Sequence, residues 1–199
     1  MPPQSYVVFL DIDGVMLPTR AYELPENKAE VKAVGSISAI RPDRVRLHPE
    51  AIAALNEIHR QIPEARLVLC TSWRHSVGVA ETVACLERNG VAEDFWHADR
   101  ACPWTPPSAL SAELGATTGS SKTDDIVAWL KTHAAKVSKW LALDDDPDLA
   151  SALISAPVPG SVMQVDGTRG LTRDDVPAIL GVLTRPTACS SANTGPTGC

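Results

Sequence analysis

The sequence predicts an α/β fold built around a central, mainly parallel sheet of five strands. Short apolar runs alternate with segments of helical periodicity, the order that places helices on both faces of a parallel sheet. Three of the runs end in polar clusters, as strands do where their carboxyl ends form a ligand site. The 199 residues, 44% of them hydrophobic, suffice for the core of a single domain.

The predicted strands are short apolar runs, the composition typical of strands buried on both faces. They lie at residues 7–10, 66–70, 95–97, 139–143 and 161–165. Predicted helices follow at residues 49–61, 77–89, 123–136, 148–154 and 172–183. The first of these is marked by Pro49 and Glu50, which suit a helix start, and by Ile52, Leu55 and Ile58 at helical spacing.

Three segments fall outside this alternation. Residues 15–47 hold three prolines and many charges, and we expect a flap over the end of the first strand, with weak alternation at 31–40 indicating a small hairpin. The proline-rich residues 99–121 predict a loop or partial lid. Residues 186–199 are rich in Ser, Thr, Gly and Pro and predict a flexible tail to a domain of residues 1–185.

Composition excludes several classes of protein. A net charge of −6 argues against broad binding of nucleic acid through a basic face, although a local basic groove remains open. The five cysteines form no Cys-x-x-Cys pair, so we expect thiols in a reducing cytoplasm. No signal peptide or membrane span is visible, and the expected location is cytoplasmic.

Asp11 and Asp13 follow the first predicted strand directly, and Gly14 then permits a turn. Residues two apart in an extended chain point the same way, so both carboxylates face one place. Two such carboxylates repel each other unless a proton or a cation lies between them, and Mg²⁺ suits oxygen ligands. The alternative for this stretch alone is an Asp-Gly turn with both acids in solvent.

The second and fourth strands end in Thr71-Ser72 and in Asp144-Asp145, and Lys122 begins a helix. Together with Asp11 and Asp13 these groups form a set suited to phosphoryl transfer. Asp11 is the candidate nucleophile and Asp13 the candidate acid and base. Thr71 and Ser72 offer donors to phosphate oxygens, Lys122 offsets negative charge, and Asp144 and Asp145 join Asp11 as metal ligands. Asp146 remains an alternative to Asp145.

Further residues admit two interpretations. Arg74 either binds substrate phosphate or pairs with a local acid. The arginines at 41, 44 and 46 either form a rim for a polyanion or, as we favour, a solvated face of the flap. Tryptophan side chains could stack on nucleobases, but core packing is favoured for Trp96, whereas Trp73 and Trp104 remain open.

These segments resemble the motifs of the haloacid dehalogenase (HAD) superfamily. Asp11-Ile-Asp13-Gly14 resembles motif I, Thr71 motif II, Lys122 motif III, and Asp144-Asp145 the double-aspartate form of motif IV. The resemblance implies a three-layer Rossmann-like fold, dependence on Mg²⁺ and phosphatase chemistry through an aspartyl-phosphate on Asp11. It also implies that Asp13 binds the metal through its main-chain carbonyl. The insert after motif I and the insert after motif II are both too short for a full cap domain. In this respect the chain resembles the capless group of the superfamily.

A narrower resemblance is to the HAD domain of Swiss Army Knife RNA-repair proteins. It rests on the segments Thr71-Ser-Trp-Arg74, Trp140-Leu-Ala-Leu-Asp-Asp-Asp146 and Gly170-Leu-Thr172. It implies a phosphorylated substrate such as a nucleotide or a nucleic-acid end. The alternatives are a phosphatase of a small metabolite or phosphoprotein, and a catalytically idle HAD fold that serves as a binding module.

Overall fold

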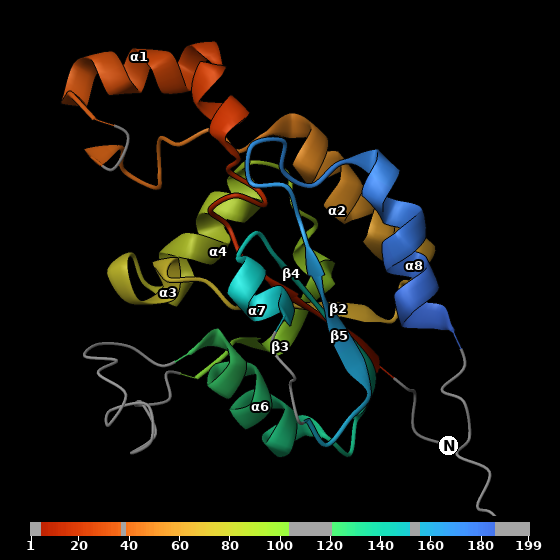
Figure 1. Ribbon diagram of the computed structural model, residues 1–199. Helices are drawn as coiled ribbons and strands as arrows, with labels where there is room; N and C mark the ends of the chain where they lie inside the picture. Colours follow the sequence, from red (N-terminus) through yellow and green to blue (C-terminus); the bar gives the residue numbers. More distant parts are fainter. Residues whose placement is uncertain (1–4, 37–38, 104–120, 152–155, 186–199) are drawn as a thin grey trace, which may run out of the picture.

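The computed structural model describes residues 5–36, 39–103, 121–151 and 156–185. Its centre is a five-stranded sheet in the order β3-β2-β1-β4-β5, and every pair is parallel (Figure 1). The expected parallel sheet of five strands is therefore confirmed. The strands are β1 (Ser5–Leu10), β2 (Ala65–Leu69), β3 (Trp96–Ala101), β4 (Val137–Asp144) and β5 (Gly160–Gln164).

The strand order reverses beside β1. The chain runs outward from β1 through β2 to β3, and then returns to place β4 on the other side of β1. The register pairs Leu10 with both Leu69 and Leu143, so the carboxyl ends of the three central strands lie level. In open parallel sheets a ligand crevice forms outside the carboxyl ends where the order reverses. The topology therefore places the residues after β1 and β4 at the expected position of a site.

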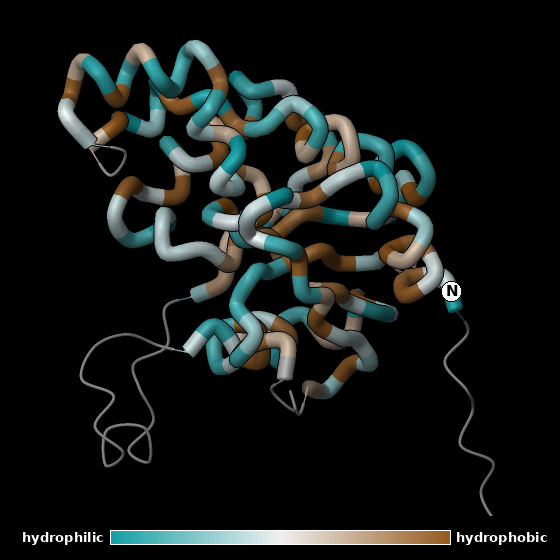
Figure 2. The backbone as a smooth tube through the Cα atoms, turned by 45° about the horizontal axis from the view of Figure 1, so that its top comes forward, coloured by the Kyte–Doolittle hydropathy of each residue, from teal (hydrophilic) through white to brown (hydrophobic). Residues whose placement is uncertain are grey.

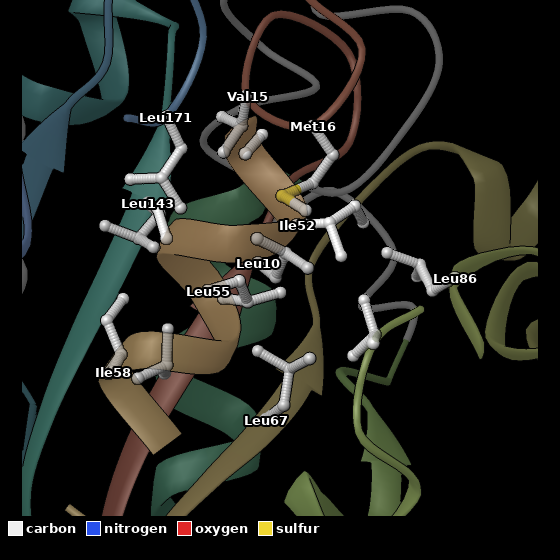
Figure 3. Close-up of a cluster of buried hydrophobic side chains, with 14 of the residues drawn as sticks. Leu10, Val15, Met16, Ile52, Leu55, Ile58, Leu67, Leu86, Leu143 and Leu171 are labelled. Atoms are coloured by element: carbon white, nitrogen blue, oxygen red, sulfur yellow. The ribbon is translucent and has the colours of Figure 1, made fainter. Parts of the chain in front are cut away.

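Alternate residues of β1 face two separate cores. Val8 and Leu10 belong to a cluster with α2 (Pro49–Gln61), α4 (Val79–Arg88) and α8 (Val176–Thr184), part of which Figure 3 shows. Val7 and Phe9 belong to the other cluster, where Phe9 meets Trp129 of α6 (Lys122–His133) edge to face. Hydrophobic segments run through the centre of the molecule in Figure 2. Helices thus cover both faces of the sheet, which gives three layers.

Most predicted helices are confirmed, with shifted ends. The helix expected at 77–89 is present as α4, which starts at Val79 because Gly78 before it has a φ of +101°. A separate short helix, α3 (Trp73–Ser76), precedes it and was not predicted. A 3-10 turn η3 (Glu93–Phe95) leads into β3, and the short helix α7 (Pro147–Ser151) follows β4. The last helix begins with a capping box of Thr172 and Asp175 in the turn η4 (Arg173–Asp175), ahead of α8.

The hairpin expected at 31–40 is wrong. The flap instead contains the 3-10 turn η1 (Thr19–Glu23) and the helix α1 (Pro25–Val34), which projects from the sheet in Figure 1. Pro25 at the first helical position and Gly35 after the last turn are helix-start and helix-stop residues, and they outweigh the weak alternation between them. The buried Asn27 joins α1 to the rest of the flap through the carbonyls of Ala21 and Arg46.

Some expectations lie outside the described residues. These are the tail at 186–199, residues 104–120 of the predicted loop, Trp104, residues 152–154 of the predicted fourth helix, and two of the five cysteines. The three described cysteines, Cys70, Cys85 and Cys102, are buried free thiols. Among the helices of the described ranges, none has the length and hydropathy that crossing a bilayer requires.

Candidate active site

Asp11, Asp144 and Asp145 converge at the point where the strand order reverses. Asp11 directly follows β1, Asp144 ends β4, and the Asp11 N–H donates to the Leu143 carbonyl at 3.1 Å. One carboxylate oxygen of each of the three aspartates lies within 4.8 Å of the others. Asp11 and Asp144 are only 5% and 2% exposed. Asp145 is partly exposed. Three carboxylates this close, two of them buried, form a set of hard oxygen donors that suits Mg²⁺.

Lys122 closes one side of this cluster. It is the first residue of α6, and its Nζ donates to Asp11 Oδ2 at 2.6 Å and to Asp144 Oδ2 at 2.7 Å. The Ser121 side chain caps the helix by accepting from the Asp124 N–H at 3.1 Å, which fixes where α6 starts. The expected approach of Lys122 to the acids is therefore present in the structure.

The electrostatics of the cluster follow from burial and crowding. Desolvation and the neighbouring Asp11 raise the pKa of Asp144 to about 6 against the pull of Lys122. The pKa of Asp145 is also raised, by desolvation and then by Asp11. Desolvation lowers the pKa of Lys122, but Asp11 and Asp144 outweigh it and the net shift is upward. Lys122 is therefore a permanent cation, and the excess negative charge around it favours a second one.

The neighbourhood of Asp145 separates it from Asp146. A Cβ on Gly14 or on Gly167 would collide with the Asp145 carboxylate. The carboxylate therefore packs directly against the backbone of these two glycines. Asp146 is exposed, and its Oδ1 accepts from the Asp148 N–H at 2.8 Å at the start of α7. The three-carboxylate group contains Asp145, and we therefore prefer Asp145 to Asp146 as the second acid after β4.

Asp13 lies beside the cluster at the surface. Its carboxylate is exposed, is not one of the three that converge, and accepts from the Trp73 indole Nε1–H at 3.0 Å. Desolvation raises the pKa of Asp13, the Trp73 hydrogen bond lowers it, and Asp11 raises it further, with a net upward shift. An exposed acid of raised pKa beside a buried carboxylate suits proton exchange with a substrate or with water.

Thr71 and Ser72 begin the turn after β2, as predicted. The Cys70 N–H donates to the Leu10 carbonyl at 2.8 Å, which brings this turn beside Asp11. The Thr71 side chain is buried, and its Oγ1 accepts from the Trp73 N–H at 3.4 Å. Ser72 is exposed and lines the same cavity as Asp13.

The expected contact of Arg74 with substrate phosphate does not fit the structure. Its side chain is 5% exposed and forms an ion pair with Asp125 of α6, whose side chain is fully buried. Arg74 Nη1 also donates to the Thr71 carbonyl at 2.8 Å. The guanidinium thus points into the protein, because the buried Asp125 carboxylate needs a partner. Arg74 stabilises the turn after β2 from its buried side.

A cavity of about 740 Å³ opens next to Asp13. The flap forms one wall and the turn after β2 with α3 forms the other. Its lining is Asp13, Leu17, Tyr22, Ala39, Ile40, Arg41, Pro42, Ser72, Trp73, Ser76 and Val77. Arg41 is paired with Asp43 at 2.9 Å, and Arg44 with Glu30 at 3.5 Å, so two of the three arginines at 41, 44 and 46 have an acidic partner. Trp96, by contrast, is 7% exposed and packs in the core as expected.

Three supporting residues were not identified from the sequence. The sequence allows stacking for Trp73 but does not indicate its hydrogen bond to Asp13, and it does not indicate a role in the site for Asp125 or Gly167. A signal existed only for Gly167, which follows an acidic residue just after the last strand near Gly170. The contacts of Trp73 and Asp125 span 60 and 51 residues and depend on packing.

Comparisons with known proteins bear on the family and the fold of the chain. The family model for the HAD domain in Swiss Army Knife RNA repair proteins matches residues 7–176. A search of curated proteins found no match.

Two solved structures of the HAD domain of the effector protein Lem4 from Legionella pneumophila are similar to this chain. The inactive mutant has a TM-score of 0.52 at 11% identity and covers 92% of this chain and 96% of its own. The other has a TM-score of 0.49 at 12% identity, with 90% and 96% covered. At this identity the likeness of the inactive mutant supports the fold alone. The match of the family model over most of the chain decides its membership, and the chain belongs to the HAD-domain family of Swiss Army Knife RNA repair proteins.

Proposed function

We propose that the protein is a Mg²⁺-dependent phosphomonoester hydrolase that acts through an aspartyl-phosphate on Asp11. The observation that carries the proposal is the convergence of Asp11, Asp144 and Asp145 around the Lys122 ammonium at the carboxyl end of the sheet. Membership of a HAD family supports the same class of chemistry. Phosphoryl transfer depends mainly on positioning and on charge stabilisation, and this cluster provides both.

The first step forms a bond between an Asp11 oxygen and phosphorus and breaks the bond from phosphorus to the ester oxygen. Asp13 gives its proton to that oxygen as the alcohol departs, and its raised pKa favours the protonated form needed for this role. In the second step Asp13 takes a proton from a water molecule that attacks phosphorus. The bond to Asp11 breaks, and inorganic phosphate leaves with both groups restored.

Asp11, Asp144 and Asp145 would hold the Mg²⁺ ion, together with the main-chain carbonyl of Asp13. When bound, the ion would neutralise the acids and polarise the phosphoryl oxygens. Lys122 holds Asp11 in place and offsets charge on the phosphoryl group. Thr71, Ser72 and the turn that they begin offer donors to the remaining phosphoryl oxygens, and the Arg74–Asp125 pair keeps that turn against α6.

The leading substrate class is a nucleotide or a nucleic-acid end. The family name refers to RNA repair, and the cavity beside Asp13 contains two aromatic side chains, Tyr22 and Trp73. Within the described residues, the insert between β1 and α2 holds only η1 and α1, which leaves the cavity mouth accessible to a large phosphate ester. A small metabolite or a phosphoprotein is the rival substrate, and an idle binding module is the rival function.

Release of phosphate from 4-nitrophenyl phosphate, with and without Mg²⁺, tests the reaction class. Wild-type protein should turn over only with the ion, and Asp11→Asn should be inactive while it keeps the wild-type fold by circular dichroism. Undiminished turnover by Asp11→Asn would disprove the nucleophile. Absence of turnover by wild-type protein on every ester of a panel would favour the idle module.

That panel should include nucleotides, oligonucleotides phosphorylated at the 3′ or 5′ end, sugar phosphates and phosphopeptides. We expect the highest kcat/KM for nucleotides or oligonucleotides. Rapid turnover of a sugar phosphate or a phosphopeptide beside inert oligonucleotides would refute the substrate assignment and leave the reaction class intact.

A further inference from the structure

We propose that the cavity between the flap and α3 binds the leaving group of the substrate as a nucleoside, with its base against Trp73 and Tyr22. In the same proposal, Trp73 orients the carboxylate of Asp13. This inference rests on the proposed function and extends it, since it assigns the specificity of the site to residues of the flap and of the turn after β2.

The cavity begins where the leaving group must emerge. Asp13, the acid that protonates the ester oxygen, is part of its lining, and so is Ser72 of the phosphate-binding turn. The group attached to that oxygen therefore enters this space when the phosphoryl group lies at Asp11. Two further cavities, one beside α8 and one beside α4, do not include Asp13 in their linings. The volume of the cavity beside Asp13, about 740 Å³, lies in the range of pockets that hold ligands of nucleoside size.

The lining combines the groups that a nucleoside needs. Tyr22 and Trp73 provide aromatic rings, and Leu17, Ile40 and Val77 provide apolar surface on which a base can pack. Ser72 and Ser76 provide hydroxyl groups within reach of ring and ribose heteroatoms. Base stacking on aromatic side chains is favourable for every base, so the lining predicts a preference for nucleosides over sugars without strong selection among bases.

The charges of the lining argue for an uncharged group in this cavity. The basic side chain in it, Arg41, is 75% exposed and is already paired with Asp43 at 2.9 Å. Asp13 opposes a second anionic group near the mouth. A sugar phosphate would leave the aromatic and apolar walls without a partner. The base of a nucleoside would cover these aromatic and apolar side chains and would bring no charge into the cavity.

Trp73 links recognition to catalysis. Its indole Nε1–H donates to Asp13 Oδ2 at 3.0 Å, while its ring lines the cavity. The edge of the indole therefore fixes the rotamer of the acid, and the remaining surface of the ring meets the leaving group. Asp13 is otherwise exposed, so removal of the N–H would leave its carboxylate free to turn into solvent.

Binding can be tested without catalysis. Addition of adenosine to ¹⁵N-labelled protein should shift the side-chain indole N–H signal of Trp73, assigned by its loss in Trp73→Phe. Ribose at the same concentration should leave that signal in place. No shift at millimolar adenosine would overturn the pocket. A shift in a protein that hydrolyses no phosphate ester would uphold the pocket and refute the proposed function.

Kinetics test the two roles of Trp73 separately. With adenosine 5′-monophosphate, Trp73→Phe keeps a ring but loses the N–H, and we expect kcat to fall about tenfold with little change in KM. Trp73→Leu loses both, and KM should also rise about tenfold, the size of one stacked base. With acetyl phosphate, which lacks a base, KM should be unchanged in both variants. Equal kcat for wild type and Trp73→Phe would overturn the orienting role.

Tyr22 supplies a matched pair of variants. Tyr22→Leu removes the ring, and KM for adenosine 5′-monophosphate should rise severalfold without a change for acetyl phosphate. Tyr22→Phe keeps the ring and should behave like wild type. If Tyr22→Leu, folded as judged by its thermal unfolding, raised KM equally for both substrates or for neither, the assignment of this wall to the base would be wrong.

Discussion

Arg74 and Asp125 form an ion pair that is buried between α3 and α6. The Arg74 and Asp125 side chains are 5% and 0% exposed, and Arg74 also donates to the Thr71 carbonyl. One end of this contact lies in the turn that follows β2, and the other lies three residues after Lys122. The pair therefore fixes the distance between the two elements that hold the candidate phosphate donors and the cation.

Removal of either partner of this pair should destabilise the protein strongly. Asp125→Asn leaves the buried guanidinium without its counter-charge, and we expect a loss of about 3–5 kcal/mol in the free energy of unfolding. Urea unfolding monitored by circular dichroism measures it. Arg44→Ala breaks the more exposed pair with Glu30 and should change stability by less than about 0.5 kcal/mol. Equal effects of the two substitutions would contradict a stabilising role of the buried pair.

The pattern of strands and polar clusters was sufficient to predict the sheet and the convergence of Asp11, Asp144 and Lys122. Level carboxyl ends follow from the parallel register, and local sequence marks where each strand stops. The role of Arg74 could not be predicted in this way. Its partner lies 51 residues away, and only the packing of α6 against the turn after β2 decides whether the guanidinium faces substrate or protein.

In the flap, by contrast, the residues that mark the structure are close together in the sequence. The prediction nevertheless followed a weaker pattern. Pro25 and Gly35 mark both ends of α1, yet the alternation at 31–40 indicated a hairpin. A residue that starts or ends a helix acts on its own backbone position. An alternating segment, by contrast, becomes a stable strand only when it pairs with other strands. None of the five described strands pairs with a segment of the flap.

Loss of the Lys122 ammonium should impair catalysis. It should also destabilise the metal-free protein, because the carboxylates of Asp11 and Asp144 then repel each other without a cation between them. For Lys122→Met we expect kcat to fall by a factor of about 10²–10³, since a charge-stabilising donor is removed. Without the bridge from Asp11 to Asp144, the thermal midpoint should drop in EDTA and rise more on addition of Mg²⁺ than in wild type. Lys28→Met, which removes an exposed partner of Glu23, serves as control. Wild-type kcat in Lys122→Met would exclude the assigned role.

The stability of the metal-free protein should fall as pH rises from about 4 to about 6. Burial and Asp11 raise the pKa of Asp144 from an ordinary 3.8 to about 6, so in this range the folded state binds a proton that the unfolded state has released. Raising the pH therefore costs free energy of folding, up to about 3 kcal/mol for this group. The pKa of Lys122 is raised from an already high value, so its contribution is constant across the range.

Urea unfolding in EDTA across this range measures the effect. Asp144→Asn should flatten the decline, because the residue that replaces the acid does not titrate. Saturating Mg²⁺ should also remove most of the decline at the upper end, because the cation offsets the repulsion among the three acids. A stability that rises from pH 4 to 6 by the same amount in wild type and in Asp144→Asn would argue against a crowded acid site.

Asp13→Asn should separate the two steps of the proposed reaction. With 4-nitrophenyl phosphate the leaving group needs little protonation, so the first step should proceed and the second, which needs a base, should stall. We expect a burst of one 4-nitrophenol per protein followed by turnover reduced about 10²-fold or more. Rapid-quench kinetics and mass spectrometry of the phosphorylated protein measure it. Asp11→Asn should give no burst, and steady wild-type turnover in Asp13→Asn would rule out the acid and base role.

Gly167→Ala should weaken Mg²⁺ binding without changing any ligand. A Cβ at this position would collide with the Asp145 carboxylate, which must then move away from Asp11 and Asp144. We expect the Mg²⁺ concentration for half-maximal stabilisation in thermal unfolding to rise about tenfold, equivalent to about 1.4 kcal/mol of binding free energy. Gly181→Ala is the matched control, because nothing lies within 4 Å of its Cβ and it sits within α8. That substitution should leave Mg²⁺ binding unchanged and stabilise the fold by about 0.5–1 kcal/mol. Identical Mg²⁺ titrations of the two variants would mean that Asp145 does not contribute to the metal site, and Asp146 would then be the acid to substitute next.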